Sequence, residues 1–133
     1  MAKLEKFEEM EVWQRARKLC DEIFQLSLAG SFAKDFELKN QINASSGSVM
    51  DNIAEGFERD GRTEFRQFLS IAKGSCGEVR SQLYRAVDRK HISSEEFDLL
   101  KGQAEEISKQ LKGFINYLNA SEYKGTKYKE AGK

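Results

Sequence analysis

The sequence predicts an all-α protein, an antiparallel up-down-up-down four-helix bundle, and three observations support this prediction. The 133-residue chain contains no proline, although about seven would be expected at an ordinary usage of about 5%. Proline breaks helix interiors, so its absence is typical of a chain that is helical almost throughout. Apolar residues recur at spacings of three and four along four segments. The connections between these segments span only a few residues, which favours antiparallel neighbours.

The first two helices are expected over residues 7–28 and 35–59. The first carries one apolar stripe, formed by Val12, Trp13, Ala16, Leu19, Cys20, Ile23 and Phe24. Asp35 is suited to cap the second helix. The stripe of the second helix is unusually small, because Ser45 and Gly56 stand where leucine would be expected. Small residues on a helix face allow a neighbouring helix to approach closely.

The third and fourth helices are expected over residues 63–90 and 94–118. Gly74 and Gly77 each cost the third helix roughly 1 kcal/mol relative to alanine, so we expect a tight helix–helix contact to offset them. The fourth helix begins with a capping box, in which Ser93 and Glu96 take the reciprocal positions.

These helices form one domain over residues 1–120, and residues 121–133 are expected to be a flexible C-terminal tail. The first residues contain no apolar stretch of signal-peptide length. The longest apolar runs are far shorter than the ~20 residues that span a bilayer. We therefore expect a cytoplasmic protein that does not contact a membrane.

Few residues suit catalysis or metal binding. A di-iron bundle needs Glu-x-x-His motifs on two helices, but the chain has one histidine, His91, which we expect at a solvated helix end. Ser75 and Cys76 lie in the middle of a predicted helix with no histidine partner. Cys20 and Cys76 fall in apolar patterns and are expected to be reduced core thiols. The sequence thus predicts no enzyme, no metal site and no cofactor.

Four polar side chains are expected to gather where the second and third helices meet: Asn52, Glu55, Ser75 and Glu78. The simpler interpretation is a hydrogen-bonded or ion-paired lock between helices, with Arg59 or Arg80 as the ionic partner. The alternative is acid–base chemistry or cation binding, for which a third functional group is missing.

A basic stripe follows one side of the third helix and is formed by Arg62, Arg66, Lys73 and Arg80. These residues fall within about 40° of one another at 100° per residue. Arginine forks at this spacing can follow phosphate groups. The alternative is a solvated flank that pairs with acids on the first two helices. The whole chain is neutral, with 22 basic and 22 acidic side chains, whereas dedicated nucleic-acid domains are usually strongly basic.

The sequence resembles the four-helix-bundle family of proteins encoded within intervening sequences of bacterial 23S rRNA genes. The resemblance covers about residues 7–118. It is carried by Val12-Trp13-Gln14, by the run from Ser48 to Gly56 with Asn52-Ile53-Ala54-Glu55-Gly56, and by Gly74-Ser75 followed by Glu78.

This resemblance implies a ring-forming homo-oligomer, with a pentamer as the expected form. Related bundles are accessory subunits of diversity-generating retroelements, in which a basic ring engages nucleic acid and a reverse transcriptase. The family signature falls here on positions that are expected to be structural: Ser48, Asn52, Glu55, Gly56, Ser75 and Glu78.

Two functions remain open. The first is a non-enzymatic protein that binds rRNA or another nucleic acid through the basic stripe. The second is a protein–protein interaction scaffold without nucleic-acid contact. In that case Phe32 and Phe36, near the connection between the first two helices, and the tyrosines of the tail would provide the contacts.

Overall fold

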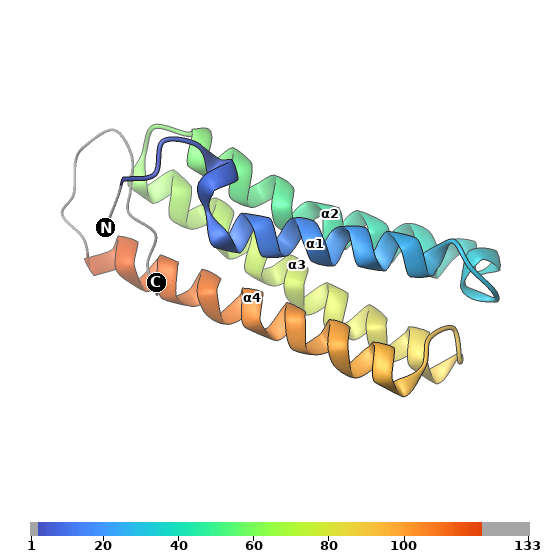
Figure 1. Cartoon of the computed structure of the whole chain (residues 1–133). Helices are drawn as coiled ribbons and strands as arrows, with labels where there is room; N and C mark the ends of the chain where they lie inside the picture. The colour runs from blue at the N-terminus through green and yellow to red at the C-terminus, as the bar shows by residue number, and fades with distance from the viewer. Residues whose placement is uncertain (1–2, 121–133) are drawn as a thin grey trace.

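The computed structural model describes residues 3–120, and within them four α-helices run side by side along one axis (Figure 1). Their bounds are α1 Glu11–Ser27, α2 Phe36–Glu58, α3 Arg62–Asp88 and α4 Ser94–Ala120. Each helix packs against the next one along the chain, and α4 also packs against α1. This arrangement confirms the predicted all-α antiparallel bundle. The predicted tail, residues 121–133, lies outside the described residues.

The first helix begins four residues later than predicted, at Glu11 rather than Phe7. Phe7–Glu9 form a separate 3-10 turn, and Met10 follows with extended backbone, which interrupts the helical path. The Glu9 carboxylate stabilises the turn by accepting hydrogen bonds from the backbone N–H groups of Glu5 (2.9 Å) and Lys6 (3.3 Å). The helix pattern alone could not separate this turn from α1.

The apolar stripes of all four helices face one core. Its aromatic centre lies between α2, α3 and α4, where the rings of Phe57 and Phe65 are 6.0 Å apart and those of Phe65 and Phe114 are 5.3 Å apart. All three rings are fully buried. Burial of one such side chain contributes about 1.5–3 kcal/mol. Within residues 3–120, none of the helices combines the length and the apolar character that crossing a membrane requires.

Helices α2 and α3 approach each other closely at Gly56. A Cβ at this position would stand 2.7 Å from Cβ of Phe68 and 3.0 Å from Cδ1 of Phe65, so only glycine fits. The expected close approach on the small face of α2 is therefore confirmed here. The tight contact expected at Gly74 and Gly77 is wrong within this chain, because no heavy atom lies within 4 Å of a Cβ at either position.

The two kinds of glycine should respond oppositely to alanine. Gly56→Ala should destabilise the fold by about 1–3 kcal/mol, because the new methyl group clashes with Phe65 and Phe68. Gly74→Ala should stabilise it by about 0.5–1 kcal/mol, because alanine favours the helix and the space is open. Urea unfolding followed by circular dichroism measures both changes. Equal stability of the two variants would contradict the assigned packing.

Candidate nucleic-acid interface

The basic stripe lies on the flank of α3 that faces α4. The Arg66 guanidinium donates a hydrogen bond to the side-chain oxygen of Asn119 on α4. Arg80 lies near Lys101 of α4. Pairing with Glu105 raises the pKa of Lys101, and the positive charge of Arg80 opposes this rise. From Arg62 to Arg80 the stripe extends about 27 Å at 1.5 Å per residue. All four stripe residues are half-buried, so their aliphatic stems lie on the protein surface.

The stripe takes part in none of the ion pairs found among residues 3–120. Glu11 of α1, Glu55 of α2 and Asp35, which caps α2, form ion pairs elsewhere: Glu11 binds Arg15 at 3.0 Å, Glu55 binds Arg59 at 2.8 Å and Asp35 binds Arg89 at 2.8 Å. The interpretation of the stripe as a flank that pairs with acids on the first two helices is therefore not supported. Its cations remain available to solvent or to an external anion.

A surface hollow of about 300 Å³ adjoins the N-terminal half of the stripe, between α3 and α4. No carboxylate lines it. Its wall consists of hydroxyl, amide and guanidinium groups with one apolar side chain, from Thr63, Arg66, Gln67, Ser70, Ile115 and Asn119. Such groups are those that contact phosphate and sugar oxygens in nucleic-acid complexes. Sequence reasoning missed the neutral members, since they carry no charge signal and α4 supplies two of them.

The family-signature residues form a smaller polar cluster than expected. The Ser48 and Ser75 hydroxyl groups are 2.9 Å apart and join α2 to α3. The Asn52 amide donates to the Ser48 hydroxyl at 2.9 Å and to the Ser48 carbonyl at 2.8 Å. Glu55 instead binds Arg59, which directly follows its own helix and was one of the two expected partners.

Glu78 is exposed and forms no hydrogen bond with this cluster among the described residues, but it borders a second hollow between α2 and α3 that Ser48 also lines. This hollow has a volume of about 500 Å³, and polar or small residues surround Glu78 there: Gln41, Ala44, Ser45, Ser48 and Gln82. The two carboxylates, Glu55 and Glu78, thus take part in different local contacts. The structure favours the lock between helices, made by hydroxyl and amide groups, over paired carboxylates for acid–base chemistry.

The thiol of Cys76 is unsuited to nucleophilic chemistry. It is fully buried in the core, and this burial raises its pKa to about 12, which keeps it protonated at neutral pH. Cys20 is also a free thiol and is partly buried. Among residues 3–120, no group of three or more histidine, cysteine, aspartate or glutamate side chains could hold a metal ion.

His91 is not at a solvated helix end, and that expectation is wrong. Its side chain is only 9% exposed, and its ring stacks on Phe32 with the centroids 5.1 Å apart. Lys90 adopts a positive φ of 61°, and the His91 N–H donates to the carbonyl of Ala86. This turn directs the ring back over the end of the bundle.

A polar network around His91 ties together the two connections at this end. Its ring nitrogens lie 2.8 Å from the Ser31 hydroxyl and 2.8 Å from the Asp35 carboxylate. The same carboxylate oxygen accepts from Arg89 at 2.8 Å, and the other oxygen caps α2 through the Leu38 N–H. The serine–histidine–aspartate order also occurs in hydrolases, but the Asp35 side chain here holds three partners, His91, Arg89 and the Leu38 N–H, which is a structural role.

This network predicts acid sensitivity. Hydrogen bonds from His91, and then from Arg89, lower the Asp35 pKa from 3.8 to about 2. A lowered folded-state pKa contributes stability above the unfolded value, and that stability is lost as the pH falls from about 4 to 2. Asp35→Asn should therefore be less stable than the wild type at pH 7, and the difference should shrink across this interval.

Urea midpoints at pH 7, 4, 3 and 2 measure this effect, with Asp51→Asn on the exposed side of α2 as the control. A constant difference between wild type and Asp35→Asn over the whole range would contradict the assigned ion pairing.

Comparisons with known proteins identify a matching family model and a similar fold. A family model described as 23S rRNA-intervening sequence protein matches residues 8–113. A crystal structure from Bacteroides thetaiotaomicron, described as a protein of unknown function from the S23 ribosomal protein family, is similar in fold with a TM-score of 0.72. The identity is 23%, and the match covers 78% of this chain and 97% of that chain. No curated protein matches the chain. Neither description names a retroelement subunit, so that part of the resemblance stays a prediction.

Proposed function

We infer a function from one premise: the chain belongs to the 23S rRNA-intervening sequence protein family. We propose that it is a non-enzymatic, ring-forming homo-oligomer that binds RNA through the basic stripe of α3. The observation that carries this proposal is that the four stripe cations form no ion pair with an acid among residues 3–120, and that one of them, Arg66, lines a hollow without carboxylates.

The chemistry of the stripe suits a phosphate backbone better than a specific base sequence. Arginine binds phosphate through two parallel N–H groups, and lysine adds a point charge. Half-buried stems limit the freedom of these side chains, so less entropy is lost when they bind. The family description connects these proteins with 23S rRNA, which makes a structured rRNA fragment the appropriate test ligand.

Ring formation would compensate for the neutral charge of the chain. A single subunit with 22 basic and 22 acidic side chains attracts RNA only through its local field. A ring repeats the stripe around an axis, and the fields of neighbouring copies add. The pentamer is the form that the family resemblance implies.

The second candidate function, a protein-interaction scaffold, is favoured by exposed apolar side chains around the α1–α2 connection. Phe24 is 45% exposed, Leu28 is 51% exposed and Phe36 is 67% exposed. Exposed apolar residues that gather in one region are typical of interaction sites. Phe32, which the sequence placed among these contacts, is instead buried beneath His91 at 1% exposure. The tail tyrosines lie outside the described residues.

RNA binding should depend on the stripe and on salt. The triple variant Arg66→Glu, Lys73→Glu, Arg80→Glu should bind a structured rRNA fragment much more weakly at 50 mM salt. Its slope of log K against log salt concentration should be shallower by about 2. Each of the three lost phosphate contacts reduces the magnitude of this slope by about 0.7–0.9. Fluorescence anisotropy between 50 and 200 mM salt measures both quantities.

A matched control carries the same charge change at Arg17, Lys18 and Lys39, which lie on α1 and α2 and outside the stripe. This control should bind nearly as the wild type does. Equal losses in both variants would assign the effect to net charge, and no wild-type binding at 50 mM salt would contradict the proposal.

Oligomer formation can be measured separately. Light scattering of the purified chain at micromolar concentration should give a mass several times the 15.2 kDa of one subunit, with five subunits as the expected number. A monomeric mass would contradict the ring but would leave the chemistry of the stripe intact.

A further inference from the structure

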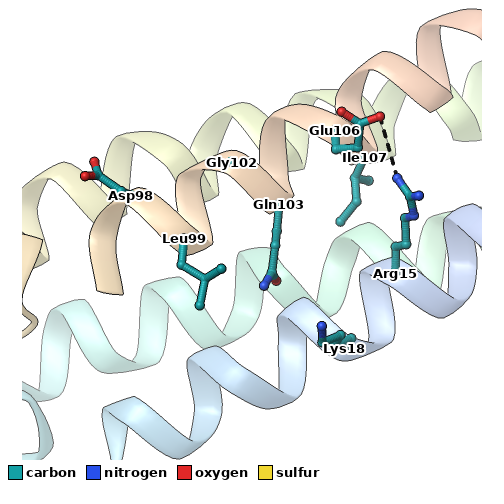
Figure 2. A pocket seen from close by; sticks show the side chains of 8 residues that line it. All are labelled: Arg15, Lys18, Asp98, Leu99, Gly102, Gln103, Glu106 and Ile107. Atoms are coloured by element: carbon teal, nitrogen blue, oxygen red, sulfur yellow. Dashed lines mark ion pairs between the residues drawn. The ribbon is translucent and has the colours of Figure 1, made fainter. Parts of the chain in front are cut away.

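An open groove follows the seam between α1 and α4, on the side of α4 opposite the basic stripe. Two hollows of about 470 and 260 Å³ open along it, and both include Leu99. In Figure 2, Leu99 and Gln103 point from α4 toward α1, while Arg15 and Lys18 project from α1. The groove is long and open, which suits an extended partner better than a small enclosed molecule.

The floor of the groove is apolar. Leu99 is 59% exposed, and Leu26, Leu100 and Ile107 also contribute to the lining. Gly102 lines the same hollow as Leu99 and Glu106. No heavy atom stands within 4 Å of a Cβ placed at this glycine. Glycine costs a helix interior about 1 kcal/mol relative to alanine. Because Gly102 has no side chain, another chain could approach the backbone of α4 closely at this position.

Side-chain oxygens along the same seam lack hydrogen-bond partners within residues 3–120. Three such buried oxygens occur, on Glu22 of α1 and on Gln103 and Gln110 of α4. Glu22 and Gln103 line the two hollows. A buried polar atom without a partner costs about 1–3 kcal/mol. A partner that brings N–H donors into the groove would relieve this cost after a small rotation of either side chain.

The charge of the groove selects a basic partner. Its lining contains two cations, Arg15 and Lys18, and five acids, namely Asp21, Glu22, Glu96, Asp98 and Glu106. Arg15 is already held by Glu11 at 3.0 Å and by Glu106 at 3.6 Å. The groove is therefore acidic overall, opposite in sign to the stripe on the other flank of α4, and it would repel RNA.

We propose that this groove binds a basic amphipathic helix of a partner protein. Its apolar face packs over Leu99 and Gly102, as amphipathic helices do in hydrophobic grooves. Its lysine or arginine side chains reach the acidic end around Glu22 and Glu96 and donate to the unpartnered oxygens. This site is separate from the proposed RNA-binding stripe and does not depend on it.

A 14-residue amphipathic peptide of leucine and lysine, with blocked ends and a fluorescent label, is the probe. Anisotropy should show saturable binding to the wild-type protein. Leu99→Ser, which removes the apolar anchor, and Gly102→Leu, which fills the approach to α4, should each weaken binding at least tenfold. Ile71→Ser on α3 is the matched control, because Ile71 is similarly exposed at 51% and lies outside the groove.

The controls distinguish binding in the groove from non-specific binding of the peptide. Circular dichroism should show that both groove variants keep the helical content of the wild type. Their RNA binding should equal that of the wild type. A leucine–glutamate peptide of the same pattern should bind at least tenfold more weakly than the leucine–lysine peptide. Equal binding of the two peptides, no binding of the basic peptide, or wild-type affinity in both folded groove variants would overturn the proposal.

Discussion

The close approach of α2 and α3 at Gly56 is the constraint on which the rest of the structure depends. Because the Phe65 and Phe68 side chains fill the space that a Cβ would need, the two helices are held at short range. Two turns away, the Ser48 and Ser75 hydroxyl groups can then meet at 2.9 Å. Together these contacts fix both the register and the rotation of α3. The rotation in turn places the basic flank of α3 beside α4.

The opposite end of the bundle is fixed by a different interaction. There the connections are short, and His91 joins them by stacking on Phe32 and bonding to Asp35. Steric fit holds the α2–α3 end, whereas polar contacts hold the α1–α2 and α3–α4 connections. The seam between α1 and α4 has no chain connection, and it is where the apolar groove remains open.

The sequence predicted what periodicity controls and missed what tertiary geometry controls. The four helices followed from apolar spacing, and the small face at Gly56 was recognised. Gly74 was expected to make a close contact only because glycine is costly inside a helix, but it lies off the apolar stripe of α3, and a Cβ there meets open space. His91 was misplaced because the positive φ of Lys90 reverses the direction of its side chain. The contact of Asn119 with Arg66 and its place in the hollow beside the stripe were invisible for a similar reason, since they depend on how α4 packs.

Helix α4 separates two surfaces of opposite charge, and its thickness makes them independent. An α-helix with its side chains is about 10–12 Å across, whereas charges are screened over about 8 Å at physiological ionic strength. The cations beside α3 and the acids beside α1 therefore influence each other weakly through solvent. Ligands of opposite charge can occupy the two flanks together without competing. A neutral chain can in this way present a basic surface and an acidic surface, although its net charge indicates neither.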